Sequence, residues 1–348
     1  MACPGPERPA RKGCSEVGQL TVADVTDDPD WDDAIWRQPG ANLYASRRWG
    51  EYKSRIGWDV RRLTLRAACG QALAYVQVQR RRRGLGHVVL AQGCPILTPL
   101  GQRRAEAVFS ALLGHLDLGR FDLLGVNYQQ FQTPEAVLAL LAQGFAPVVT
   151  TRTHTLEVDL RQEMEAIRSG MEGRWRDVLR QAERNPDLTA AFLTDPDERL
   201  RAFETFGRLY AELKRRKGFR NSLDMAAFRD LAAHDPNLLF LEMRERDEPI
   251  LVRIVHRTAR RWTDLYVASN ERAKVTGAGR LALWRLIGRA KGEGAAVLDL
   301  GGIDPAGNPG VYEFKRGVCR NAVASNPLWL FSRSAVMRRA ATAVLATR

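Results

Sequence analysis

The segment Lys274-Val275-Thr276-Gly277-Ala278-Gly279 stands directly before a stretch predicted to be helical. Closely spaced glycines at the start of a helix leave backbone N–H groups uncovered, and the positive end of the helix dipole adds to their attraction for an anion. The segment therefore predicts a site for a phosphate or pyrophosphate group at Lys274, Gly277 and Gly279. A flexible loop that merely enters a helix is the alternative.

Two further cations stand on predicted helices. Lys53 follows Trp49 by four residues, so both side chains lie on one face of a predicted helix. A lysine beside an aromatic ring can bind a phosphate or a sugar nucleotide. Arg216 lies in the basic run 214–217, at the end of a long predicted helix that includes Tyr210. The alternatives are solvent-exposed charges on both helices, with Trp49 in the core.

The dipeptide Phe314-Lys315 comes after the segment Leu298–Asp304 and a loop rich in glycine and proline at 301–310. By itself it is no more than a dipeptide of a last strand.

The cysteines and histidines indicate neither a metal site nor a disulfide framework. The five cysteines are scattered and none forms a CxxC pair, and the five histidines contain no HExxH motif. No run approaches the roughly 18–20 apolar residues that span a bilayer. The first eighteen residues carry prolines and charges where a signal peptide needs an apolar core. We expect a cytoplasmic, metal-free protein with a flexible tail at 1–19.

Helical and strand patterns alternate in both halves of the chain, in a similar order but without a sequence repeat. In the first half, strand patterns stand at 60–67, 72–80 and 87–91, a hairpin turn at Arg80–Arg83, and helices at about 46–57, 103–118 and 134–143. In the second half, helices are predicted at 163–184, 196–216, 225–233 and 279–293, three strands between 237 and 269, and a last strand and helix after the loop at 301–310. This pattern predicts a mixed α/β fold with largely antiparallel sheets, and the length of 348 residues favours two domains.

The formal net charge of +13 favours a polyanionic partner. Nucleic acid, an acidic membrane surface and a phosphorylated substrate all fit this charge, and a basic surface kept for solubility is the remaining alternative.

Several segments between about 44 and 318 resemble, in their order, the Fem family of aminoacyl-tRNA-dependent peptidyl (aminoacyl) transferases. They are Trp49 and Lys53 followed by Gly57-Trp58, the strand His154–Leu160, the helix Arg176–Ala182, the helix from Tyr210 to Arg216-Lys217-Gly218-Phe219, and the DLGGI strand end followed by Phe314-Lys315. The segment 274–279 resembles the pyrophosphate loop of the GNAT acetyltransferase superfamily, with lysine where that loop usually has glutamine or arginine.

The resemblance implies a tandem of GNAT-like domains and a role for each matching residue. Lys53 and Arg216 would contact the diphosphate of a nucleotide-linked acceptor, with Trp49 and Tyr210 beside them. Phe314 and Lys315 would lie at the reaction channel, with the lysine toward the aminoacyl-tRNA. An amine attacks an ester that is already activated, so positioning and oxyanion stabilisation supply much of the rate.

The resemblance also implies that no cofactor is needed beyond aminoacyl-tRNA as co-substrate. A general base is not identified, although three acids stand near the motif: Asp299, Asp304 and Glu313. The domains would cover 20–155 with 326–348, and 156–325, the C-terminal segment returning to the first domain.

Departures from the family pattern leave the acceptor open. The chain lacks the heptad pattern of the long helical arm found in one branch, so it is similar to the arm-less, FemX-like members. Gln92–Pro95 and Arg220 also depart from the family's usual residues. The acceptor is either a peptidoglycan precursor peptide or the amine of a peptide or nucleoside intermediate in antibiotic biosynthesis.

Two other classes of function fit the sequence. The segment 274–279 also suits a CoA-dependent N-acyltransferase that uses acetyl-CoA. The basic runs 80–83 and 214–217 suit a non-enzymatic RNA-binding protein, although no RNA-reading motif accompanies them.

Overall fold

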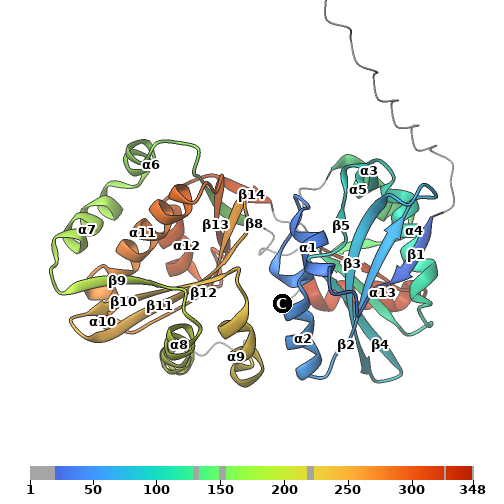
Figure 1. Cartoon of the computed structure of the whole chain (residues 1–348), viewed down its shortest axis with the longest axis horizontal. Helices are drawn as coiled ribbons and strands as arrows, with labels where there is room; N and C mark the ends of the chain where they lie inside the picture. The colour runs from blue at the N-terminus through green and yellow to red at the C-terminus, as the bar shows by residue number, and fades with distance from the viewer. Residues whose placement is uncertain (1–19, 128–132, 149–153, 218–222, 325–326, 347–348) are drawn as a thin grey trace, which may run out of the picture.

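The computed structural model describes residues 20–127, 133–148, 154–217, 223–324 and 327–346. These residues form two mixed sheets, each covered by helices (Figure 1). The predicted fold class, a mixed α/β chain with two largely antiparallel sheets, is confirmed. The predicted tail at 1–19, the Gly218-Phe219 end of one motif and Arg220 lie outside the described residues.

The first sheet has the strand order β1-β2-β3-β4-β6-β15-β7, with β5 paired to β3. Its strands are β1 (Thr21–Asp24), β2 (Asp59–Arg66), β3 (Ala72–Arg83), β4 (Gly86–Gln92), β5 (Ile96–Leu97), β6 (Leu123–Asn127), β7 (Ala146–Val148) and β15 (Leu328–Phe331). Its helices are α1 (Trp31–Trp36), the 3-10 turn η1 (Leu43–Ala45), α2 (Arg47–Arg55), α3 (Pro99–Arg103), α4 (Ala105–Leu116), α5 (Pro134–Ala142) and α13 (Ala335–Ala346).

The second sheet has the order β14-β8-β13-β12-β11-β10-β9. Its strands are β8 (His154–Asp159), β9 (Leu188–Leu193), β10 (Leu238–Glu245), β11 (Glu248–Arg257), β12 (Arg261–Ser269), β13 (Val297–Gly302) and β14 (Ala322–Ala324). Its helices are α6 (Met164–Gly170), α7 (Gly173–Arg184), α8 (Pro196–Lys217), α9 (Met225–His234), α10 (Glu271–Val275), α11 (Ala278–Gly292) and α12 (Pro309–Arg316).

The two sheets repeat one arrangement. In each, four antiparallel strands are followed by a strand parallel to the fourth, and an antiparallel strand comes next. The parallel pairs are β4 with β6 and β12 with β13. In the first sheet the next strand is β15, which returns from the far end of the chain, whereas in the second it is β8, which enters from the first half. The similar order of elements in the two halves therefore reflects a duplicated sheet.

A hydrophobic cluster joins the two sheet units. The hydroxyl oxygen of Ser46 accepts a hydrogen bond from the Trp49 backbone N–H and so caps α2. The inner face of α2 buries Trp49 and Tyr52, which share a cluster with residues of α8, α9 and one face of the second sheet. The ring of Tyr52 lies 5.5 Å from that of Phe228 on α9. The opposite face of the second sheet has its own core with α7 and α11 (Figure 1).

Three local predictions were wrong. Arg80–Arg83 continue strand β3, and the turn lies at Gly84 and Leu85, because Arg83 still pairs with Gly86. Lys274 belongs to the short helix α10 and not to a loop. Phe314 and Lys315 lie on helix α12 and not on a strand, because Pro309 in the first turn fixes a helical φ. Within the described part of the chain, no helix is both long and apolar enough to cross a membrane.

Candidate active site

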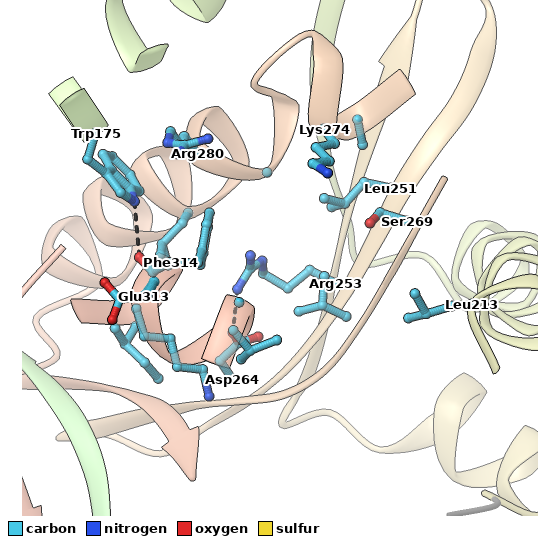
Figure 2. A pocket seen from close by; sticks show the side chains of 18 of the residues that line it. Trp175, Leu213, Leu251, Arg253, Asp264, Ser269, Lys274, Arg280, Glu313 and Phe314 are labelled. Atoms are coloured by element: carbon cyan, nitrogen blue, oxygen red, sulfur yellow. Dashed lines mark hydrogen bonds and ion pairs between the residues drawn. The ribbon is translucent and has the colours of Figure 1, made fainter. Parts of the chain in front are cut away.

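A cavity of about 850 Å³ opens on the face of the second sheet that carries α7, α11 and α12 (Figure 2). It brings together five residues predicted from the sequence, which are Arg216, Lys274, Gly279, Phe314 and Lys315. Cations outnumber acids in its lining, with four acidic side chains against six cationic ones: Arg174, Arg216, Arg253, Lys274, Arg280 and Lys315. The cavity is therefore suited to an anionic ligand.

The cavity lies where two parallel strands separate. β12 and β13 pair only from Arg261 with Val297 to Thr263 with Asp299. Beyond Asp299 the pairing of β13 with β8 is irregular, and Gly301 has a positive φ of 76° that favours glycine. The strands therefore diverge, and the N-terminus of α11 and the side chains of α12 line the space between them.

Asp299 holds the diverging backbone in place. Its carboxylate accepts hydrogen bonds from the Gly301 N–H at 2.9 Å, from the Thr155 hydroxyl and from Arg261 at 2.7 Å. Arg261 also donates to Glu157 at 2.6 Å. Burial alone would lower the pKa of Arg261, but Asp299 and Glu157 raise it above its usual value. Asp299, one of the acids considered as a base, is thus engaged in a structural network.

Phe314 and Lys315 are anchored at the cavity wall. The indole N–H of Trp175 donates to the Phe314 carbonyl at 3.1 Å, and the two rings lie 5.9 Å apart. Lys315 Nζ donates to the carbonyls of Gly302 at 2.8 Å and Gly301 at 3.1 Å. Burial lowers the pKa of this ammonium group. Two of its three N–H donors are thus occupied, and one is left for a ligand.

The cavity lining includes a buried ion pair that was not predicted from the sequence. Arg253 Nη1, from β11, donates to the carboxylate of Asp264, from β12. Their side chains are 3% and 7% exposed. Burial raises the pKa of Asp264, and the charges of Arg253 and Lys315 oppose that rise.

Arg280 adds a cation between aromatic rings at the cavity's edge. Its guanidinium carbon lies 5.8 Å from the ring centres of both Trp175 and Phe314. Burial, and then the charge of Arg174, lower the pKa of Arg280. Its Nε is buried without a hydrogen-bond partner. Arg280 lines the cavity and forms no ion pair with an acid of the described residues, so its charge is available to an anionic ligand.

The glycines of segment 274–279 have different roles. Gly277 caps α11 in the left-handed conformation, with φ 74°, and no side chain caps this helix. A Cβ on Gly277 would lie 2.8 Å from Val178 Cγ1 on α7. A Cβ on Gly279 would only touch Phe314 and Leu251, at 3.8 and 3.9 Å. Gly277 thus serves close helix packing, while Gly279 borders the cavity.

Gly277→Ala is expected to lower the free energy of unfolding by about 2 kcal/mol, because alanine is strained at this φ and its Cβ meets Val178. Urea unfolding followed by circular dichroism measures this loss. Gly292→Ala, in the same helix and with no atom within 4 Å of the added Cβ, is the matched control and should leave stability unchanged or slightly raised. If both substitutions changed the free energy of unfolding equally, Gly277 would not be required for the close packing of α11 on α7.

Lys53, Trp49 and Tyr210 do not line this cavity. Lys53 Nζ lies 4.7 Å from the ring centre of Trp58 and 5.8 Å from that of Trp49. Trp49 is buried between Tyr44 and Tyr52, and Tyr210 stacks on a phenylalanine of its own helix. Trp58, rather than Trp49, is therefore the nearer aromatic partner of Lys53.

Lys53 and Arg81 form a second concentration of positive charge, on the first sheet unit. The guanidinium of Arg81 lies 5.9 Å from the ring centre of Trp58, the same ring that Lys53 approaches. Burial, and then the charge of Arg81, lower the pKa of Lys53. Across the described ranges neither cation forms an ion pair. Arg216, for which the resemblance implies a role beside Lys53 at the acceptor's diphosphate, lines the cavity of the second sheet unit and forms an ion pair with Glu271.

The cavity residues that the sequence did not predict include Arg253, Asp264, Trp175 and Arg280. Arg253 carried a signal, because it interrupts an apolar row, Leu251, Arg253 and Val255, on one face of β11. Asp264 stands likewise among apolar residues of β12. Nothing in the sequence distinguished Trp175 and Arg280, because only the packing of α7, α11 and α12 brings them together.

Residues 147–316 match the family model described as "Acetyltransferase (GNAT) domain". The crystal structure of FemX superposes on the chain with a TM-score of 0.73 at 14% identity, covering 90% of this chain and 98% of FemX. The chain has the FemX fold. The two sheet units described above are thus GNAT-like domains in tandem, as the resemblance to the Fem family implied.

Two further structures share this fold. The C-terminal domain of a putative lysylphosphatidylglycerol synthetase from Agrobacterium fabrum has a TM-score of 0.59 at 14% identity, covering 91% of this chain and 93% of that domain. L-PGS from Bacillus licheniformis has a TM-score of 0.57 at 14% identity, and the superposition covers 96% of this chain and 100% of L-PGS. A search of curated protein sequences found no significant match.

Proposed function

We propose that this protein is an aminoacyltransferase that moves an amino acid from an aminoacyl-tRNA to an amine, with formation of a peptide bond. The observation that carries the proposal is the cavity itself, in which Phe314 and Lys315 lie beside the start of α11 and an excess of cations. The FemX fold supports it, as does the name of the Agrobacterium fabrum protein, which denotes a lysyl product. The net charge of +13 suits a tRNA partner.

In this proposal, the terminal phosphates of the tRNA bind near Lys274, Arg280 and the N-terminus of α11, where the helix dipole and N–H groups favour an anion. The aminoacyl ester then reaches toward Phe314 and Lys315. The free N–H of Lys315 is available to a tRNA phosphate or to the ester oxygen. No cofactor takes part, and an aminoacyl-tRNA donor would require the reaction to occur in the cytoplasm.

The acceptor is proposed to lie toward the first domain, where Lys53 and Arg81 would hold a diphosphate. A nucleotide-linked peptidoglycan precursor provides such a group. An amine intermediate of antibiotic biosynthesis is the other acceptor class, with or without a phosphate.

Lys53→Met is expected to raise the KM for a phosphate-bearing acceptor about tenfold while kcat stays within twofold, because a charge-assisted hydrogen bond is lost from binding alone. Steady-state transfer assays measure both constants. An acceptor amine that carries no phosphate is the control, and its KM should not change. An unchanged KM for the phosphate-bearing acceptor would remove Lys53 from the acceptor site.

A CoA-dependent N-acyltransferase is the second candidate, favoured by the match of residues 147–316 to the GNAT acetyltransferase domain. The start of α11 would then bind the pyrophosphate of acetyl-CoA. Calorimetric titration with acetyl-CoA separates the candidates, since saturable binding with turnover favours this one.

The experiment that tests the main proposal is a transfer assay with each of the twenty charged tRNAs against a wall precursor and a panel of small amines. At least one tRNA should lose its amino acid in an acceptor-dependent way, and tRNA binding should weaken steeply with added salt. Turnover of acyl-CoA without transfer from any charged tRNA would overturn the proposal in favour of the second candidate.

A further inference from the structure

A charged pair interrupts an otherwise apolar face of the second sheet. On β11, Leu251 and Val255 point into the core beneath α11, and Arg253 lies between them on the same face. Arg253 is 2% exposed and pairs with Asp264 on the neighbouring strand. Replacing a buried ion pair by well-packed apolar residues is often neutral or stabilising, so such a pair adds little to a fold. Its place in the cavity lining points to a role in the reaction.

The pair leaves one donor of Arg253 facing the cavity. Nη1 is bonded to Asp264 and Nε is enclosed without a partner, while Nη2 forms no hydrogen bond with any residue that the structure describes. Figure 2 shows the guanidinium reaching from β11 into the open space beside Phe314, with one nitrogen directed to Asp264. Arg253 is thus a cation fixed at one end and free at the other.

The same pair lies next to the lysine of the proposed reaction channel. Asp264 follows the last residue of β12 that pairs with β13, so it stands where the strands separate. A Cβ on Gly301 would lie 3.0 Å from the Asp264 carbonyl oxygen and 3.6 Å from Lys315 Nζ. Lys315 and the Arg253–Asp264 pair therefore border the same small region of the cavity.

We infer that Arg253, held in position by Asp264, donates a hydrogen bond from Nη2 to the carbonyl oxygen of the donor ester as negative charge develops on it. This inference rests on the proposed function, which places the reacting ester at Phe314 and Lys315. Arg253 is then a catalytic residue and Asp264 a positioning residue. A donor fixed before the reaction stabilises the oxyanion without reorganisation.

The step balances within the two substrates. The acceptor nitrogen forms a bond to the ester carbonyl carbon, and the carbonyl electron pair moves to the oxygen that Arg253 binds. When the C=O bond re-forms, the bond to the tRNA ribose oxygen breaks, and that oxygen takes the proton that the amine loses. The products are an amide and a tRNA with a free hydroxyl group.

The test removes the whole pair, so that no unpaired charge stays buried. Arg253→Met/Asp264→Leu is expected to keep or raise the melting temperature and to lower kcat about 100-fold, with both KM values within threefold. The milder Asp264→Asn should lower kcat less, since Arg253 remains. Arg244→Met/Glu242→Gln removes another ion pair of the same sheet, outside the cavity lining, and should leave kcat within twofold.

Measuring kcat with tRNAs charged with different amino acids distinguishes oxyanion stabilisation by Arg253 from recognition of the amino acid's side chain. An equal loss of kcat with every donor supports the inference. A loss confined to one amino acid would overturn it in favour of side-chain recognition, and an unchanged kcat would overturn it outright. A lower melting temperature with activity reduced only in proportion to the folded fraction would show a structural role and also overturn it. Failure of the proposed function is distinguishable, because the wild type itself would then transfer nothing from charged tRNA.

Discussion

Lys315→Met is expected to lower kcat for aminoacyl transfer about 100-fold while the acceptor KM changes less than twofold. Lys315 lines the cavity and its Nζ is held on the carbonyls of Gly301 and Gly302, so its remaining N–H has a fixed direction. Methionine keeps the length of the side chain but provides neither a charge nor a donor. Steady-state kinetics with a charged tRNA as the varied substrate measure the loss.

Two controls make the Lys315 result specific. Lys315→Arg keeps the positive charge and should recover part of the activity. Urea unfolding of Lys315→Met should show a loss of no more than about 2 kcal/mol, because two hydrogen bonds to backbone carbonyls disappear. An acceptor KM that rises while kcat is unchanged would assign Lys315 to the acceptor and contradict the proposed role.

Asp299→Ala is expected to lower the free energy of unfolding by about 3 kcal/mol. The substitution removes the acceptor of three hydrogen bonds, from Thr155, Arg261 and Gly301. This loss of about 3 kcal/mol lies at the low end of the range expected when one partner of a buried ion pair is removed. The reason is that Arg261 is one third exposed and keeps its ion pair with Glu157. Urea unfolding at neutral pH measures the change.

The same substitution should also lower activity, because Asp299 fixes the backbone whose carbonyls hold Lys315. Asp247→Ala, at an exposed turn, is the control, and its effect on stability should stay below about 0.5 kcal/mol. A stable Asp299→Ala protein with full activity would show that the separation of β12 and β13 does not depend on this network.

Much of the fold was predictable because local patterns determine it. The alternation of apolar and polar residues predicted the strand at 72–80. Ser46 indicated the start of α2, and its hydroxyl oxygen accepts the capping hydrogen bond there. The helix of Phe314 and Lys315 was missed because α12 has only eight residues, too few for a periodic signal. Its start depends on Pro309, in a loop whose other prolines and glycines predicted no helix.

The site was predictable only in part, because long-range pairing assembles it. The segment 274–279 and Phe314-Lys315 were found by their sequence, but Arg253 and Asp264 meet across two strands whose pairing the sequence does not state. Lys53 approaches Trp58 because Gly57, with φ 83°, turns the chain back so that the Trp58 N–H donates to the Lys53 carbonyl at 3.1 Å. The helical spacing from Trp49 could not reveal this contact.

The aminoacyltransferase activity is best tested by the amount of amide product formed per aminoacyl-tRNA discharged, measured by mass spectrometry with an amine acceptor present and absent. We expect one amide for each ester consumed, dependence on the acceptor, and loss of this product with Lys315→Met. Discharge without amide formation, or amide formation from acetyl-CoA but from no charged tRNA, would contradict the proposed activity.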